Sequence, residues 1–187
     1  QISYPDPQSS LARITAAMDA ATAAGIPVVL IQHLAPAGAP IFAPGSEGAA
    51  LHPEIARRPH DLLVSKHLAS ALAGTGLAEW LRERGVDTLT LVGYMTHNCD
   101  DATARHAAHT GWKVELLHDA TGALPYRNAV GAASAEEIHR VFTVVMHTGF
   151  AAVVSTADWL QALANGQPLA ADNVFLSHQR ALASPPA

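Results

Sequence analysis

The sequence predicts an α/β fold: a single-domain, three-layer α/β/α arrangement around a mainly parallel, doubly wound sheet. Short apolar runs rich in β-branched residues alternate with longer segments of helical periodicity. Such alternation favours parallel strands joined by helices that cover both faces of the sheet. With 49% hydrophobic and 14% charged residues, the chain suits a sheet that is buried on both faces. At 187 residues, one domain spanning 1–187 is the simplest organisation.

The expected strands are apolar runs that end at polar, glycine or proline residues. They cover 28–31, 62–64, 88–92, 114–117 and 152–154. The expected helices begin after a Ser or Thr that can serve as N-cap and end near a glycine. They cover 10–24 (capped by Ser9 or Ser10), 76–84, 96–109, 135–147 and 157–165. Because a helix comes first, the alternation also predicts a strand ahead of it, which would precede Gln1.

Two segments contain no convincing helix or strand. Residues 32–60 hold five prolines and three glycines, and a loop of this length in a compact domain is usually functional or a lid. Residues 167–187 carry Pro168, Pro185 and Pro186 and are expected to form an extended tail.

Charge and composition exclude several classes of protein. A net charge of −5 without a cluster of Lys or Arg argues against nucleic acid as a partner. No apolar run approaches the ~18 residues of a membrane span. A single cysteine excludes an intrachain disulfide and favours a cytoplasmic location.

That cysteine, Cys99, follows the strand 88–92 and lies at or just before the start of the helix 96–109. Unpaired N–H groups and the helix dipole favour an anion at such a place, and cysteines so placed often react as thiolates. The alternative is a small apolar side chain that packs the helix on the sheet. His33 and Lys66 also follow strand ends, and the carboxyl ends of parallel strands share one edge of a sheet. This convergence favours a functional Cys99.

Three segments of the chain match the motifs of one enzyme superfamily. The first comprises Gly93, Thr96, Cys99, Thr103, Ala104, Gly111, Trp112, Asp119 and Ala120. The second runs from Lys66 to Leu77 and the third from Ser134 to Arg140. Together they resemble the isochorismatase-like cysteine hydrolases, which include nicotinamidases, N-carbamoylsarcosine amidases, ureidoacrylate hydrolases and isochorismatases. The resemblance extends from Gln1 to about Leu160 and implies the fold of that superfamily.

The resemblance also implies catalytic residues. Cys99 would be the nucleophile and Lys66 the lysine of an Asp-Lys-Cys triad. The Asp is expected upstream of Gln1, at the end of a central strand whose absence should leave a gap in the core. A non-proline cis peptide is expected at Tyr94–Met95, with the N–H groups of Met95 and Cys99 forming the oxyanion hole.

Other side chains are candidates to line a substrate pocket: Tyr94, His97, His33 and Phe42. His33 is about as often structural at a strand end. In nicotinamidases an Asp-x-His metal site follows the second strand, whereas this chain has Ile31-Gln32-His33. We therefore expect no metal and no organic cofactor. Asp100 and Asp101 are expected to act as dipole partners at the helix start, with side chains that point away from Cys99.

These inferences lead to one functional hypothesis with two rivals. The chain is expected to be a hydrolase that cleaves a C–N bond of a small amide, ureido or carbamoyl compound through a thioester. One rival is vinyl-ether hydrolysis of the isochorismatase type, whose enzymes can lack the cysteine. The other is a catalytically silent binding protein on the same fold. The partners expected are a small-molecule substrate and further copies of the chain, in a homodimer or larger oligomer.

Overall fold

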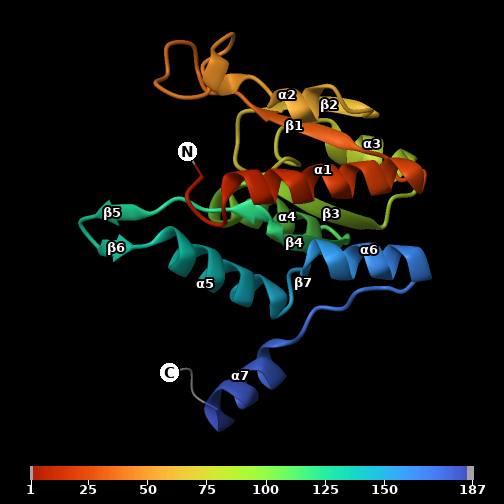
Figure 1. Cartoon of the computed structure of the whole chain (residues 1–187), viewed down its shortest axis with the longest axis vertical. Coiled ribbons are helices and arrows are strands. Elements are labelled where there is room, and N and C mark those ends of the chain that lie inside the picture. The colour runs from red at the N-terminus through yellow and green to blue at the C-terminus, as the bar shows by residue number, and fades with distance from the viewer. Residues whose placement is uncertain (1, 185–187) are drawn as a thin grey trace.

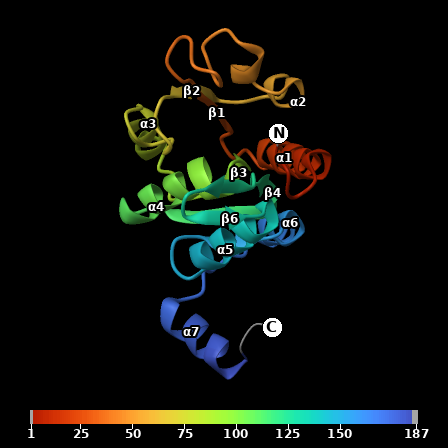
Figure 2. The same cartoon turned by 90° about the vertical axis from the view of Figure 1, so that its left-hand side faces the viewer.

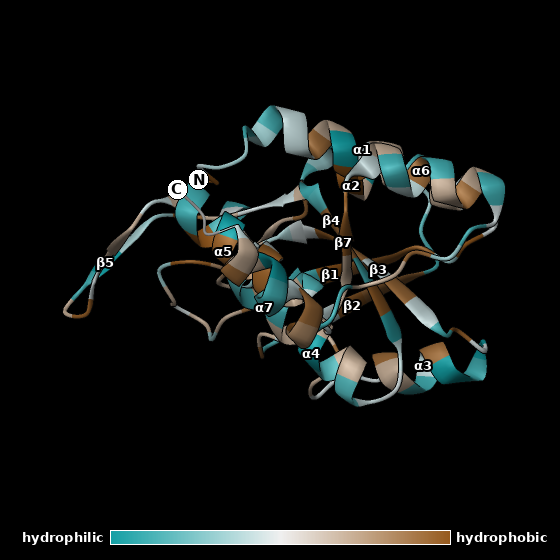
Figure 3. Cartoon of the chain, turned by 90° about the horizontal axis from the view of Figure 1, so that it is seen from below, coloured by the Kyte–Doolittle hydropathy of each residue, from teal (hydrophilic) through white to brown (hydrophobic). Residues whose placement is uncertain are grey.

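The computed structural model describes residues 2–184, and Figure 1 labels its elements. Seen from below, its strands lie between helices on two sides (Figure 3). The helices are α1 (Pro7–Ala23), α2 (Pro53–Ala56), α3 (Leu77–Glu83), α4 (Asp101–His109), α5 (Ala135–His147), α6 (Thr156–Asn165) and α7 (Val174–Ala183), with a 3-10 turn, η1 (Glu47–Ala49), and a π-helical turn, η2 (Thr96–Asp100). The strands are β1 (Val29–His33), β2 (Leu62–Lys66), β3 (Thr88–Tyr94), β4 (Lys113–Gly122), β5 (Tyr126–Asn128), β6 (Gly131–Ala133) and β7 (Ala152–Val154).

The strands of the α/β layer pair in parallel, as predicted. β3, β4 and β7 form one sheet in the order β3-β4-β7, and β1 pairs with β2 in a second. Among residues 2–184 no ladder joins β1 to β3, so each of these strands has an edge without a strand partner there. No residue of β3 is fully buried, although a central strand of a doubly wound sheet would be covered on both faces.

The core has two parts, one on each face of β4. Leu116 and Leu117 are adjacent and both fully buried. Leu116 packs with residues of α3, α4 and α5, including Met146, whereas Leu117 packs with residues of α1 and α6, including Trp159. Successive side chains of a strand point to opposite faces. The pattern of β4 therefore confirms a sheet with helices on both sides.

The start of α1 differs from the sequence prediction. Its N-cap is Asp6, whose carboxylate accepts the N–H of Ser9 at 2.8 Å, and Pro7 occupies the first helical position. Proline suits this position because its missing N–H would have no partner there. Ser10, one of the two caps expected, is instead fully buried, and its hydroxyl lies 2.5 Å from that of Tyr94.

Four short elements lie outside the predicted helices and strands. The segment 32–60 contains η1 and α2, and the segment after β4 contains the antiparallel hairpin of β5 and β6. The hairpin projects from the body of the molecule (Figure 3). These elements are short and largely exposed, so the sequence carries little hydrophobic periodicity to predict them.

The prediction of an extended tail was wrong, because residues 174–183 form α7. The Asn173 side chain caps this helix by accepting the N–H of Leu176 at 2.8 Å. The prolines flank the helix rather than interrupt it, and Pro185 and Pro186 lie outside the described residues. None of the helices within 2–184 is long and apolar enough to cross a bilayer.

Candidate active site

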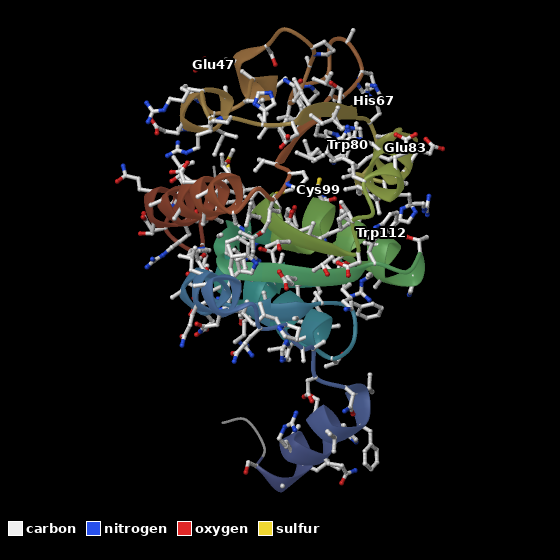
Figure 4. All side chains as sticks on the ribbon, turned by 90° about the vertical axis from the view of Figure 1, so that its right-hand side faces the viewer. Glu47, His67, Trp80, Glu83, Cys99 and Trp112 are labelled. Atoms are coloured by element: carbon white, nitrogen blue, oxygen red, sulfur yellow. The ribbon has the colours of Figure 1, made fainter. Side chains whose placement is uncertain are left out.

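The sequence candidates Lys66 and Cys99 meet at the centre of the molecule. Lys66 is the last residue of β2, and Cys99 lies in η2, the turn that follows β3. Lys66 Nζ lies 3.1 Å from Cys99 Sγ. Figure 4 shows Cys99 between the β1–β2 pair and the β3 sheet. Two parallel strands thus bring a nucleophilic side chain and a cation together at their carboxyl ends, as the sequence predicts.

The Lys66 side chain is held by hydrogen bonds that occupy all three of its N–H donors. Besides Cys99 Sγ, its Nζ contacts the carbonyl oxygen of Leu68 at 3.0 Å and His33 Nδ1 at 3.1 Å. The residue is only 3% exposed. A buried ammonium with three partners has a fixed position, so its charge is directed at the sulfur.

His33 acts as one of these hydrogen-bond acceptors. Burial lowers the pKa of His33, and the positive charges of Lys66 and His67 lower it further. The imidazole is therefore neutral at neutral pH, and its Nδ1 can accept a hydrogen bond from the Lys66 ammonium. The ring also packs edge-on against Phe42, at 5.4 Å between ring centroids. His33 and Phe42 therefore belong to the same cluster as Lys66 and Cys99.

The backbone that carries Cys99 turns sharply between β3 and α4. Gly93 has a φ of 114°, and the Tyr94–Met95 peptide bond is cis, the geometry that the resemblance implies. The carbonyl of Met95 then accepts the N–H groups of Asn98 and Asp100, at 3.0 and 3.2 Å. The role of the Met95 and Cys99 N–H groups as oxyanion donors stays a prediction.

A network of buried polar side chains packs against this turn, and the sequence does not predict it. Asp100 is buried, and its carboxylate accepts a hydrogen bond from the Thr121 hydroxyl. The Thr121 hydroxyl lies 3.0 Å from the Thr96 hydroxyl, which in turn lies 3.0 Å from His139 Nδ1. Burial raises the pKa of Asp100 from 3.8 to about 6, although the Thr121 hydrogen bond and the Lys66 charge oppose the rise. Asp100 lies at the start of α4, as expected, and its side chain is buried in this network; its role as a dipole partner stays a prediction.

Asp101, the other expected dipole partner, lies in the first turn of α4. Its carboxylate binds Arg105 Nε at 2.9 Å on the helix surface. Two adjacent aspartates thus have different surroundings, which sequence alone does not distinguish.

The remaining pocket candidates are spread around the turn. Tyr94 is bound through its hydroxyl to Ser10 on α1. His97 faces the hairpin and α5: its Nε2 lies 2.8 Å from the hydroxyl of Tyr126, and its ring packs edge-on against Phe142. Burial lowers the pKa of His97, and its buried Nδ1 has no hydrogen-bond partner among residues 2–184. The contacts of His97 thus differ from those of the Lys66–Cys99 cluster.

The aspartate of the expected triad is not seen among the described residues. No carboxylate within 2–184 forms an ion pair with Lys66, and Gln1, the residue nearest the expected Asp, lies outside this range. Nor do three His, Cys, Asp or Glu side chains in this range gather where they could hold a metal ion.

Comparisons with known proteins identify the family of this chain. Residues 4–158 match the family model described as the isochorismatase domain. Over 98% of this chain and 88% of the other, a crystal structure of an isochorismatase-type protein from Burkholderia xenovorans LB400 superposes with a TM-score of 0.96 and 59% identity.

Two curated relatives are similar in sequence. The secreted isochorismatase effector Isc1 of Verticillium dahliae is 36% identical over 62% of this chain, and the match spans 60% of the effector's length. The ureidoacrylate amidohydrolase RutB of Methylobacterium radiotolerans is 30% identical over 82% of this chain and 67% of its own. With the matched domain covering most of the chain, this protein belongs to the isochorismatase family of hydrolases.

Proposed function

We propose that this protein hydrolyses a C–N bond in a small amide, ureido or carbamoyl compound, with Cys99 as the nucleophile. The observation that carries the proposal is the 3.1 Å contact between Cys99 Sγ and the buried ammonium of Lys66. A fixed cation beside the sulfur stabilises a thiolate, which is the reactive form of cysteine.

The reaction proceeds in two steps. Cys99 Sγ bonds to the carbonyl carbon, the C–N bond breaks, and the leaving nitrogen takes a proton; the product is a thioester on Cys99. Water then attacks the thioester, which releases the acid and restores the thiol. In the family pattern a carboxylate takes the thiol proton and later delivers it. The N–H groups of Met95 and Cys99 would bind the oxyanion in both steps.

The relatives support the choice of substrate class. RutB is described as an amidohydrolase of ureidoacrylate, a ureido compound. The presence of Cys99 favours covalent chemistry over vinyl-ether hydrolysis, which does not need a thiol. His33 and Phe42, which lie next to Lys66, add an imidazole and an aromatic face to the site, and these suit a small planar substrate.

An activity screen of the full-length protein tests the proposal. The panel contains primary amides, ureido acids, N-carbamoyl amino acids and a vinyl-ether acid. We expect turnover of at least one C–N substrate and complete loss of this turnover in Cys99→Ala. Turnover should be unchanged in Lys113→Met, the control, because Lys113 is the second of the chain's two lysines and is exposed. Turnover that survives in Cys99→Ala, or turnover of the vinyl ether alone, would refute the proposal.

A further inference from the structure

The position of Cys99 depends on how the two ends of its turn are held. This turn, η2, is a π-helical turn of five residues, with Thr96 first and Asp100 last. Single π-helical turns are rare and occur frequently at functional sites. Because Cys99 is the fourth residue of η2, a shift of either end would move its side chain. The groups that bind the two ends therefore determine where the sulfur lies.

One side chain outside the turn binds both of its ends. The hydroxyl of Thr121, near the end of β4, lies 3.0 Å from the hydroxyl of Thr96 and donates a hydrogen bond to the carboxylate of Asp100. Thr96 and Thr121 are fully buried, and Asp100 is buried as well. β4 is the middle strand of the sheet β3-β4-β7. A single hydroxyl thus joins the first and last residues of η2 to the middle strand of this sheet.

The hydrogen bonds continue from the turn to α5. The Thr96 hydroxyl also lies 3.0 Å from Nδ1 of His139, a buried residue of α5. The ring of Tyr4 packs edge-on against this imidazole, at 5.4 Å between ring centroids. Figure 2 shows α5 next to the strands of the sheet. The resulting chain of hydrogen bonds runs from Asp100 through Thr121 and Thr96 to His139.

The charge of Asp100 determines the direction of these hydrogen bonds. Burial raises the pKa of Asp100 to about 6, so at pH 7.5 its carboxylate is ionised and can only accept. Each threonine hydroxyl has one hydrogen to donate. Thr121 gives its hydrogen to Asp100 and must accept the hydrogen of Thr96. The oxygen of Thr96 then accepts from His139, which must carry a proton on Nδ1.

We propose that Thr121 is a positioning residue for the nucleophile Cys99. Its hydroxyl holds both ends of η2 and so keeps Cys99 Sγ 3.1 Å from the ammonium of Lys66. Among residues 2–184 this hydroxyl has hydrogen bonds to Thr96 and Asp100 alone, so it acts through the turn rather than on the substrate. The inference rests on the proposed function, in which Cys99 attacks the substrate.

The rate at which iodoacetamide alkylates Cys99 tests this inference without a substrate. Thr121→Val keeps the shape of the side chain but lacks the hydroxyl. We expect it to slow alkylation at pH 7.5 by about tenfold, because the sulfur moves away from its cation. Thr121→Ser retains the hydroxyl and its hydrogen bonds, so its rate should lie within about twofold of the native rate.

The matched control is Thr156→Val. Thr156 is also buried, and its hydroxyl donates to Asp119 at 2.7 Å. This variant likewise removes a buried hydroxyl that binds an aspartate, but one in α6, outside the chain of hydrogen bonds at η2. It should react like the native protein, and circular dichroism establishes that each variant is folded. A folded Thr121→Val that reacts like the native protein, or a Thr121→Ser that reacts as slowly as Thr121→Val, would overturn the proposal.

Turnover of a substrate found in the activity screen gives a second measurement. Thr121→Val should lower kcat by about 10–100-fold and leave KM nearly unchanged, because a displaced nucleophile slows the chemical step without weakening substrate binding. A rise in KM with kcat unchanged would contradict the positioning role, since Thr121 would then serve substrate binding instead.

Long-range proton–nitrogen correlation NMR at pH 7.5 tests the direction of the hydrogen bonds in the native chain, with His139→Gln to identify the signals. We expect a protonated Nδ1 of His139 in the native chain and in Thr121→Ser. In Thr121→Val the hydrogen of Thr96 is free to bind His139, so Nδ1 should be unprotonated.

An unprotonated Nδ1 in the native chain would overturn the proposal, because Thr96 would then donate to His139 and not to Thr121. This measurement on the native chain stands even if Thr121→Val does not fold. Neither the alkylation rates nor the NMR signals depend on turnover. A failure of this inference is therefore distinct from a failure of the proposed function, which the activity screen tests.

Discussion

The three hydrogen bonds of Lys66 determine which atoms feel its charge, and Cys99 Sγ is one of them. We predict that Lys66→Met slows alkylation of Cys99 by iodoacetamide at pH 7 by about tenfold or more, because the thiolate loses its nearest cation. Cys99 is the only cysteine, so labelling measured by intact mass reports on this site alone.

The matched control is Lys113→Met. Lys113 is exposed at the start of β4 and is the only other lysine. Its loss should leave the alkylation rate unchanged. Equal rates for Lys66→Met and the native protein would show that the ammonium does not activate the sulfur.

Asp100 gives the fold a dependence on pH. Its pKa in the folded protein is about 6, raised by burial from 3.8. Because the folded-state pKa lies above the unfolded-state value, the stabilisation that the protonated carboxyl provides is complete below about pH 3.8 and is lost as pH rises through about 6. The ionised form at neutral pH is less stable by about 3 kcal/mol on this basis.

We therefore predict that Asp100→Asn removes this loss. The difference in free energy of unfolding between the variant and the native protein should shift by about 2–3 kcal/mol in favour of the variant when the pH is raised from 4 to 7.5. Urea unfolding at both pH values measures the difference. Asp87→Asn is the control, because Asp87 is exposed and its only side-chain hydrogen bond among residues 2–184 is to its neighbour Thr88. A difference between variant and native protein that is the same at pH 4 and pH 7.5 would contradict the assignment.

At the scale of single residues, the sequence predicts the side chains that follow strand ends. It does not predict the buried polar side chains that contact one another next to the turn between β3 and α4. Cys99 and Lys66 each lie in a recognisable motif and follow a predicted strand, and both features indicate a functional site. Asp100, Thr121 and His139 lie far apart along the chain, and only the turn between β3 and α4 brings them together. Their contacts depend on tertiary structure, which no local pattern records.

At the scale of elements, caps and apolar runs predicted most helices and strands of the α/β layer. The capping box of α5, Ser134 with Glu137, is present as expected. The errors concern elements that are stabilised by less regular means: the α1 cap, the hairpin β5–β6 and α7. In α7, local hydrogen bonds made by Asp172 and Asn173 stabilise the helix. The prolines on either side of it in the sequence led to the prediction of an extended tail instead.

The end of β4 is a place where an added methyl group should destabilise the fold. A Cβ on Gly122 would lie 2.6 Å from Ile2 Cγ2 and 3.0 Å from the carbonyl oxygen of Tyr4. We predict that Gly122→Ala lowers the free energy of unfolding by about 1–3 kcal/mol, because the segment before α1 must move away from β4. Urea unfolding measures this change.

Gly48→Ala serves as the control for this prediction. A Cβ there would have its nearest neighbour at 4.0 Å, so its effect should stay within about 0.5 kcal/mol. If Gly122→Ala proves as stable as Gly48→Ala, the close approach of the N-terminal segment to β4 is not present in solution.

At the scale of the whole molecule, the sequence predicts a parallel α/β layer, and the structure has it. Lys66 and Cys99, the two catalytic candidates, come together beyond the carboxyl ends of its strands. The ladder is interrupted between β1 and β3 within residues 2–184. Lys66 and Cys99 lie on either side of this interruption. Within the described part of the chain, β2 pairs with β1 alone, whereas η2 follows β3. The site therefore depends on how the two sheets are held together.

We also predict that the hydrolytic activity of this protein does not depend on a metal ion. His33 Nδ1 contacts the Lys66 ammonium at 3.1 Å, and a cation there would repel a metal ion. Exhaustive dialysis of the full-length enzyme against EDTA should leave its turnover of a C–N substrate unchanged. Activity that is lost on dialysis and restored by zinc, iron or manganese would overturn this prediction.

If Cys99 is the nucleophile, it becomes acylated during hydrolysis of the C–N bond. Intact-mass spectrometry of the full-length enzyme, quenched in acid during turnover of a substrate found in the screen, tests it most directly. We expect a mass increase equal to the acyl group, localised to the peptide that contains Cys99 and absent from Cys99→Ala. Rapid turnover with no such adduct at any quench time, or the same adduct in Cys99→Ala, would contradict it.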